Sequence, residues 1–169
     1  IARAGFDAYD IDMSKIHVED TPLCKDNYRE YTEHLNGVAD KCGISCNQAH
    51  APFPVYRAEI YGYQKRAIEC TAEAGGKICI IHPDNHKTAE ENAQMYFELL
   101  PFAKEHGVKI ATENMWCWTK DGDHATSAAC SHHDDFVKHL RAVNDTHFGA
   151  CLDIGHAAMG GLGTSIREM

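Results

Sequence analysis

A unit of helix, glycine, short apolar strand and polar side chain repeats along the chain, and this repeat restricts the fold more than any other feature. Four successive units end in His50, His82, Glu113 and Asp153, at intervals of 31 to 40 residues. A strand–helix–strand unit needs about 30 residues or more, so the intervals match. Strands that alternate with helices form a parallel sheet with right-handed crossovers. The repeat therefore predicts an α/β fold.

Apolar periodicity and helix signals set the boundaries of these elements. Thr88 and Glu91 form a capping-box pattern at the start of one helix, and Pro101 is expected to kink that helix. The predicted helices are 25–42, 56–74, 88–106 and 131–143. The predicted strands are 5–12, 44–50, 77–82, 108–113 and 150–153. The first helix is expected to bury one face, made of Tyr28, Tyr31, Leu35, Val38 and Cys42.

The polar residues at the strand ends are expected to meet. The strands are apolar on both sides of the pleat, which is typical of a parallel sheet covered by helices. Parallel strands direct their carboxyl ends to one side, and that side carries the ligand site in a closed (β/α)8 barrel and in an open sheet alike. We therefore expect His50, His82, Glu113, Asp153 and His156 to lie together.

The residue types in this group favour a divalent metal site. Imidazole nitrogens and carboxylate oxygens suit Zn²⁺, Mn²⁺ or Co²⁺. The strand ends carry no cysteine, which argues against a structural zinc site. Each residue alone also has a plainer interpretation: the two histidines could be solvated or capping residues, Glu113 could cap a loop, and Asp153 could be the N-cap of a following helix.

Two tryptophans, Trp116 and Trp118, follow Glu113 closely along the chain. An indole beside a strand-end carboxylate commonly forms the apolar wall of a site for a sugar or another ring. The alternative is that the indoles cover the mouth of a barrel. We expect Trp116 to contact the substrate.

Composition argues against several classes of protein. The net charge is −9 and the chain has no cluster of Lys and Arg, so a nucleic-acid partner is not expected. No run of apolar residues is long enough for a membrane span. None of the eight cysteines forms a C-x-x-C pair, so we expect buried, reduced thiols in a cytoplasmic protein.

The remaining histidines receive structural interpretations. His132 and His133, with the two aspartates that follow them, are expected at a helix start, where acids offset the helix dipole. The glycine-rich segment 159–163 lacks the Lys and Ser or Thr of a phosphate loop and is expected to be a mobile connection. Polar helix faces or turns are expected for His34, His86, His106, His139 and His147.

Four segments together resemble the xylose isomerase-like TIM-barrel superfamily, which includes sugar and sugar-phosphate isomerases and epimerases and metal-dependent apurinic endonucleases. The segments are QAHAPFP (48–54), IIHP (80–83), TENMW (112–116) and LDIGHA (152–157). The resemblance implies a (β/α)8 barrel of about 250 residues. Because five strands are visible, we expect residues 1–169 to be a single domain and a truncated portion of such a barrel, without its first strand–helix unit and its last strands.

The two branches of this superfamily imply different roles for the same residues. In the isomerase branch, Glu113 and Asp153 bind one divalent ion, Glu113 is also an acid/base residue, and His50, His82 and His156 contact the substrate. In the nuclease branch, His50 and His82 are zinc ligands with Glu113, and His156 joins a further zinc. The family completes its metal site with a His and a Glu from later strands, so we expect the site in this chain to be incomplete.

The favoured hypothesis is a divalent-metal-dependent sugar or sugar-phosphate isomerase or epimerase. A carboxylate would move a proton beside a carbonyl, through an enediolate that one Mn, Mg, Co or Zn ion stabilises. The indoles favour this branch, because they suit a sugar face. The expected partner is a small sugar or sugar phosphate, with no nucleic acid and no membrane, and a homo-oligomer is compatible with the sequence. The alternatives are a zinc phosphodiesterase of the apurinic endonuclease type and a non-catalytic barrel.

Overall fold

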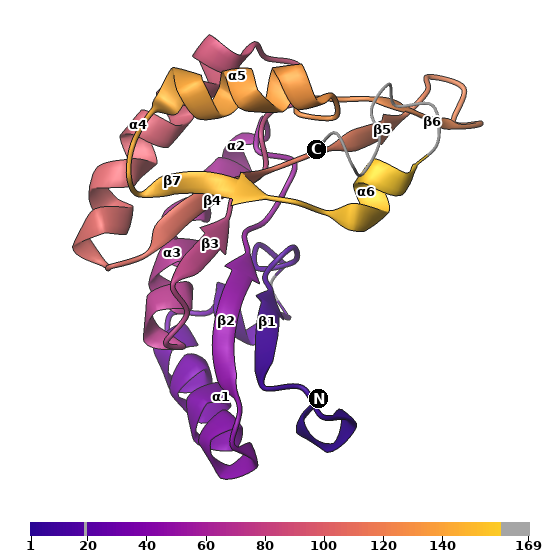
Figure 1. The fold of residues 1–169 in the computed structure, drawn as a ribbon. Coiled ribbons are helices and arrows are strands. Elements are labelled where there is room, and N and C mark those ends of the chain that lie inside the picture. Colours follow the sequence, from indigo (N-terminus) through magenta and orange to yellow (C-terminus); the bar gives the residue numbers. More distant parts are fainter. Residues whose placement is uncertain (19, 160–169) are drawn as a thin grey trace.

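Five parallel strands form one curved sheet in the computed structural model, which describes residues 1–18 and 20–159. The sheet order is β1-β2-β3-β4-β7, and each adjacent pair is parallel. The strands are β1 (Ala8–Asp12), β2 (Ser45–His50), β3 (Ile78–Ile80), β4 (Lys109–Glu113) and β7 (Phe148–Cys151). The long helices lie on one side of this sheet (Figure 1). The predicted α/β fold is confirmed, since the strands of this parallel sheet alternate with helices along the chain.

The helices alternate with the strands as expected, but one predicted helix is divided. They are α1 (Tyr28–Cys42), α2 (Ala58–Tyr61), α3 (Gln64–Glu73), α4 (Ala89–Glu105), α5 (His133–Val143) and α6 (Ile154–Ala158), with 3-10 turns at Ala2–Ala4 and Pro22–Cys24. The helix predicted over 56–74 is interrupted at Gly62 and Tyr63, because glycine disfavours a helix interior. The expected connection from residue 160 onward lies outside the described residues.

The helix starts differ in how well the sequence predicted them. The capping box of α4 is confirmed, since the Glu91 N–H donates to Thr88 Oγ1 and the Thr88 N–H donates to the Glu91 carboxylate. Helix α4 runs through Pro101 without interruption. Helix α5 begins two residues later than predicted, because the His132 ring accepts from the Asp134 N–H and caps the helix.

The buried face of α1 differs from the prediction. Tyr28, Thr32 and Ala39 are its buried residues, whereas Tyr31 and Val38 are exposed. The buried Thr32 hydroxyl donates to Glu73 at the end of α3, against which α1 packs. The buried face of α1 therefore includes a polar contact between helices, and apolar spacing alone could not reveal it.

The core lies between the sheet and the helices. Alternate strand residues point to the other face of the sheet, away from the helices, which we call its inner face. Cys79 and Ile110 point into the helix-facing cluster, which also contains Tyr96 and Leu99 of α4. Side chains alternate between the two faces of a strand. Ile110 of β4 packs against the helices, so Glu113, three residues later, lies on the opposite face of the sheet. The core thus fixes the strands whose ends carry the polar residues.

Two features were not predicted. A short antiparallel hairpin, β5 (Trp116–Trp118) with β6 (Ala125–Ser127), projects beyond the sheet after β4 (Figure 1). Strands β3 and β7 also end two residues before the predicted positions, and the chain leaves the sheet before His82 and Asp153.

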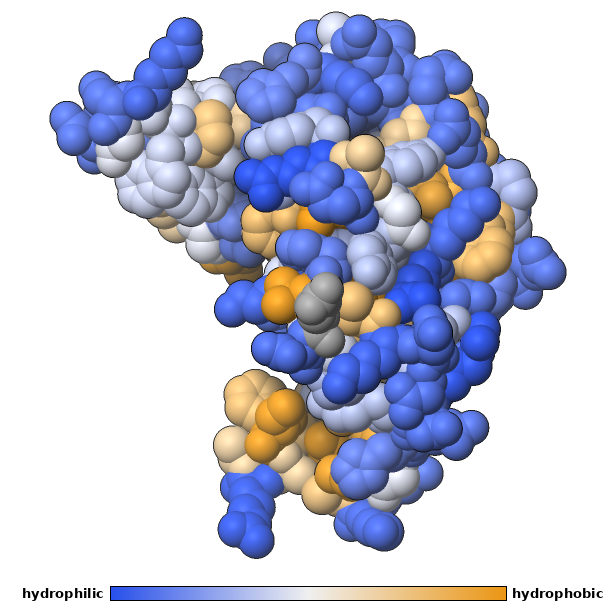
Figure 2. All heavy atoms as spheres, turned by 180° about the vertical axis from the view of Figure 1, so that it is seen from behind, coloured by the Kyte–Doolittle hydropathy of each residue, from blue (hydrophilic) through white to orange (hydrophobic). Residues whose placement is uncertain are grey.

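The surface and the thiols agree with the composition. Figure 2 shows a largely polar face with scattered apolar side chains. All eight cysteines are free, and four are buried, namely Cys46, Cys70, Cys79 and Cys130. None of the helices within residues 1–18 and 20–159 combines the length and the apolar character needed to cross a membrane.

Candidate active site at the carboxyl ends of the strands

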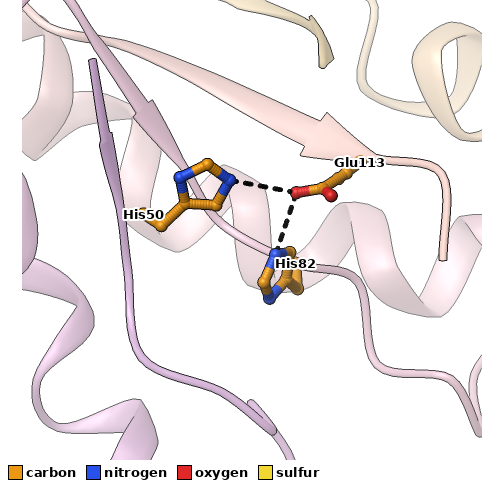
Figure 3. Close-up of side chains that lie close together, drawn as sticks. All are labelled: His50, His82 and Glu113. Atoms are coloured by element: carbon orange, nitrogen blue, oxygen red, sulfur yellow. Dashed lines mark hydrogen bonds and ion pairs between the residues drawn. The ribbon is translucent and has the colours of Figure 1, made fainter. Parts of the chain in front are cut away.

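The strand-end residues meet around the carboxylate of Glu113. His50 and Glu113 are the last residues of β2 and β4, and His82 lies two residues beyond β3. His82 Nε2 is 2.9 Å and His50 Nε2 is 3.4 Å from Glu113 Oε2. Figure 3 shows both rings directed at this one oxygen. The other oxygen, Oε1, lies 3.2 Å from Nδ1 of His156.

Asn114 connects β4 to the start of α6 and thereby brings His156 to the same place. Its side-chain amide donates to the carbonyl of Asp153 at 2.9 Å and accepts from the Asp153 N–H at 2.7 Å. The carbonyl of Asn114 lies 2.8 Å from His156 Nδ1. This buried asparagine was not among the predicted site residues, although its position beside Glu113 in the sequence is a usable signal.

Asp153 has a structural contact on one oxygen only. Its Oδ1 accepts from the His156 N–H at 2.9 Å and caps α6, which is the plainer interpretation that its sequence allowed. Its Oδ2 lies 3.7 Å from His156 Nε2 and faces the site. Gly155 leaves room for this arrangement, because a Cβ there would come within 3.0 Å of Asp153 Oδ1. One carboxylate oxygen therefore stays available to a ligand.

Two groups of three ligand atoms share Glu113. His50, His82 and Glu113 form one group, which we call the carboxyl-end cluster, and Glu113, Asp153 and His156 form the other. In each group the ligand atoms lie within 4.8 Å of one another. His82 Nδ1 is buried without a hydrogen-bond partner. The nitrogen and oxygen donors fit a divalent ion such as Zn²⁺, Mn²⁺ or Co²⁺.

The electrostatics of the metal-free site follow from burial and from these contacts. Burial would raise the pKa of Glu113, but hydrogen bonds and charge from His50 and His82 lower this pKa to about 2. Hydrogen bonds to Asp10 and then to Glu113 raise the pKa of His50 to about 10 against the opposing effect of burial. The buried carboxylate is therefore ionised at neutral pH and is paired with a positive charge.

Asp10 is a site residue that the sequence analysis missed. It lies on β1, and its carboxylate oxygens are 3.0 and 3.2 Å from His50 Nδ1. The signal was present in the sequence, because Asp10 and Asp12 interrupt an otherwise apolar strand with a spacing of two residues.

A cavity of about 660 Å³ opens over these groups. Trp116 lies on its wall, in an edge-on contact with Trp118, and Phe53 packs edge-on against the ring of His82 at 4.7 Å between centroids. Phe53 and Tyr56 were not predicted, and they follow the strand-end His50 in the loop after β2. The cavity is lined by His50, Phe53, Pro54, Tyr56, His82, Glu113, Met115, Trp116, Cys117, Trp118, Asp153 and His156.

A second set of metal-binding residue types lies away from this cavity. Cys130, Asp135 and His139 also have their ligand atoms within 4.8 Å, and we call them the α5 cluster. The prediction that His139 lies on a polar helix face is wrong, because its side chain is 1% exposed. Its Nδ1 contacts the Asp135 carbonyl at 2.9 Å, and its Nε2 lies 3.2 Å from the Asn92 amide. Both ring nitrogens are therefore already paired.

Comparison with known proteins gives one family match and many structural matches. The model of a family described as "Xylose isomerase-like TIM barrel" matches residues 1–169. No curated protein matches the chain. Two structures illustrate the likeness. A D-tagatose 3-epimerase-like protein is 19% identical with a TM-score of 0.69, and the match covers 96% of this chain and 66% of that chain. A xylose isomerase domain protein from Planctomyces limnophilus is 15% identical with a TM-score of 0.71, and the match covers 99% of this chain and 61% of that chain.

A third structure carries a metal. It is an IOLI protein with a bound zinc atom (TM-score 0.63, 19% identity, 99% of this chain and 59% of that chain). At these identities the likeness concerns the fold, and it confirms the prediction of a partial TIM barrel. The chain spans less than two thirds of the length of each of the three structures.

Proposed function

The chain belongs to the xylose isomerase-like TIM barrel family, and on this premise we propose that it functions as a divalent-metal-dependent sugar isomerase or epimerase. The structural neighbours include a D-tagatose 3-epimerase-like protein, which makes a sugar the substrate to test first. We propose that one ion binds between Glu113 and the free oxygen of Asp153. We also propose that His50, His82, His156 and Trp116 contact the sugar.

The position of Glu113 carries this proposal. The residue is 1% exposed, yet Oε2 faces the imidazoles of His50 and His82 and Oε1 faces that of His156. A buried carboxylate needs a cation or several donors to offset its desolvation. Its low pKa keeps it ionised, which is the state that a metal ligand requires.

The chemistry assigned to the residues follows from their positions. A bound divalent ion would polarise the sugar carbonyl and stabilise an enediolate. Glu113 is proposed as one acid/base residue, which accepts the proton from the carbon beside the carbonyl. The imidazoles of His50, His82 and His156 would bind hydroxyls, because each ring reaches the cavity from a different element.

The cavity wall supports a sugar as the substrate. Trp116, Trp118, Phe53 and Tyr56 provide aromatic faces, and neither Lys nor Arg is among the described residues that line the cavity. Aromatic rings pack well against the apolar C–H face of a sugar. This part of the cavity is therefore suited to the ring and hydroxyls of an uncharged ligand.

Two broader features complete the proposal. We propose that residues 1–169 act as one domain, since a single sheet and one core cluster connect β1 to β7. We also propose a cytoplasmic location, which the eight free thiols support.

The test combines metal analysis with proton exchange. The chain loaded with Mn²⁺ is incubated with D-tagatose in D2O, and incorporation of deuterium at C3 is followed by NMR. We expect exchange and about one bound ion per chain, and we expect both to be lost in Glu113→Gln. The matched control is His34→Gln on α1, which should behave as wild type. Absence of bound metal, or exchange that survives in Glu113→Gln, contradicts the proposal.

The carboxyl-end cluster favours a second candidate, a zinc phosphodiesterase of the apurinic endonuclease type. In that function His50 and His82 would bind zinc together with Glu113, which their common approach to Glu113 Oε2 permits. The net charge of −9 opposes it, because phosphate contacts require basic residues. More than one zinc per chain, with cleavage of an oligonucleotide at an abasic site, would favour this candidate over the isomerase.

A further inference from the structure

We propose that Asp10 is a positioning residue that holds the His50 ring in its active orientation, with Nδ1 fixed and Nε2 directed at Glu113 and the cavity. The inference rests on the proposed function, in which His50 contacts the sugar. It assigns a role on β1, the strand that contributes none of the predicted site residues.

The pairing of β1 with β2 places Asp10 beside His50. In the parallel register Asp10 is opposite Gln48, and Asp12 is opposite His50. Asp10, Gln48 and His50 therefore lie on the same face of the sheet. Both oxygens of Asp10 are within 3.2 Å of His50 Nδ1, so Asp10 accepts a hydrogen bond from the Nδ1–H. Because this contact holds Nδ1, the opposite nitrogen, Nε2, is the one that faces Glu113 Oε2, at 3.4 Å.

Gln48 holds the carboxylate of Asp10 in turn. Its side-chain amide donates to Asp10 Oδ2 at 2.9 Å. The contacts therefore run from Gln48 to Asp10, to His50 and to Glu113 Oε2, and they cross from the inner face of the sheet to its carboxyl edge. A carboxylate that hydrogen-bonds the far nitrogen of a working histidine fixes the ring plane, and at metal-binding histidines its removal costs about 10–100-fold in metal affinity or activity.

A comparison of the two histidines shows why His50 needs this contact. The His82 side chain is 6% exposed and is confined by packing against Phe53. Its Nδ1 has no partner, so packing and the contact of Nε2 with Glu113 hold the ring. The His50 side chain is 31% exposed, and a partly exposed ring loses rotational freedom when it is held in one orientation. Asp10 supplies the restraint that packing gives to His82.

The experiment compares Asp10→Ala with Asp10→Asn, His50→Gln and the double variant Asp10→Ala/His50→Gln. Asp7→Asn is the control, because it removes the same charge from the segment just before β1. The first readout is NMR of the metal-free protein with ¹⁵N-labelled histidine. We expect a downfield, slowly exchanging Nδ1 proton on His50 in wild type and Asp7→Asn, a weaker signal in Asp10→Asn, and loss of the signal in Asp10→Ala.

The second readout is kinetic, with D-tagatose as the probe and Mn²⁺ as the metal. We expect Asp10→Ala and His50→Gln each to raise KM about tenfold, with kcat and Mn²⁺ affinity within about twofold of wild type. The double variant should be no worse than His50→Gln alone, because Asp10 acts through His50.

The outcomes separate this inference from the proposed function. Persistence of the Nδ1 signal in Asp10→Ala overturns the role of Asp10, whatever the protein does to sugars. A further increase in KM when Asp10→Ala is added to His50→Gln overturns it as well, as does a loss of Mn²⁺ affinity equal to that of Glu113→Gln. If wild type neither binds Mn²⁺ nor exchanges D-tagatose, the proposed function fails, and the NMR comparison still decides how His50 is held.

Discussion

The carboxyl-end cluster and the α5 cluster contain similar side chains in different circumstances. Each has its ligand atoms close enough to hold an ion. In the α5 cluster the polar atoms are paired within the protein: Cys130 N–H donates to Asp135 Oδ2 at 2.8 Å, and both nitrogens of His139 have partners. In the carboxyl-end cluster two imidazoles face one carboxylate oxygen, His82 Nδ1 has no partner, and a cavity lies alongside.

The difference teaches that residue type does not distinguish a site from a structural network. His139 bridges α4 and α5 through Asn92, whose amide also contacts the carbonyls of Asp84 and Lys87. The cluster thus ties two helices and a loop together, and its imidazole has no free nitrogen. The carboxyl-end cluster has unmet hydrogen-bonding capacity and an open side, which is what a ligand needs.

The largest expected effect is on metal affinity. Glu113→Gln removes the carboxylate that both candidate ligand groups share, so we expect the affinity for Mn²⁺ to fall by about 100-fold or more. Asp135→Asn makes the same change in the α5 cluster and should leave the affinity within about twofold. Isothermal titration calorimetry measures both. A loss of affinity in Asp135→Asn would remove the distinction between the clusters.

The next effect is on stability. His139→Leu removes the buried hydrogen bonds that the imidazole makes with the Asn92 amide and the Asp135 carbonyl, so we expect the free energy of unfolding to fall by about 1–3 kcal/mol. His50→Gln, in a partly exposed ring, should cost less than about 1 kcal/mol. Urea denaturation of the metal-free variants gives the two values. Equal losses would mean that both clusters are structural.

A smaller effect is expected on sugar binding. Trp116→Ala removes an indole that lines the cavity and contacts Trp118, so we expect D-tagatose to bind about tenfold more weakly, or about 1.4 kcal/mol. Phe97→Ala removes an exposed ring from α4 and serves as the control. Equilibrium binding in the presence of Mn²⁺ tests the pair. An unchanged affinity in Trp116→Ala would assign the indole to the barrel mouth rather than to the sugar.

The smallest effect is a pH dependence of metal-free stability. The raised pKa of His50, about 10, means that its contribution is complete below about pH 6.5 and is lost as pH rises toward 10. The lowered pKa of Glu113, about 2, means that its contribution is complete above about pH 4.5 and is lost as pH falls toward 2.

The stability difference between wild type and His50→Gln should therefore be largest between about pH 4.5 and 6.5. It should shrink on either side of that range. Urea midpoints at a series of pH values measure the difference. A difference that grows above pH 7 would show that the charge of His50 does not stabilise the fold.

Part of the site was within reach of the sequence. The strand ends at His50 and Glu113 and the capping box at Thr88 follow from local patterns, because apolar runs, glycines and cap residues act over a few positions. The convergence of His50, His82, Glu113 and His156 follows from parallel topology. The environment of His139 did not follow, since its burial depends on Asn92, which is 47 residues away in the sequence.

The sequence by itself determined a parallel α/β sheet with its polar side chains on one rim, because the periods of strands and helices are local properties of the chain. Only the tertiary structure decided which of those side chains are paired. Asp10 joins His50 from a neighbouring strand, one oxygen of Asp153 is used as a helix cap, and His139 is sealed between two helices. The physical reason is that a hydrogen bond depends on distance and direction in space, and residues far apart in the sequence meet only when the strands are in register.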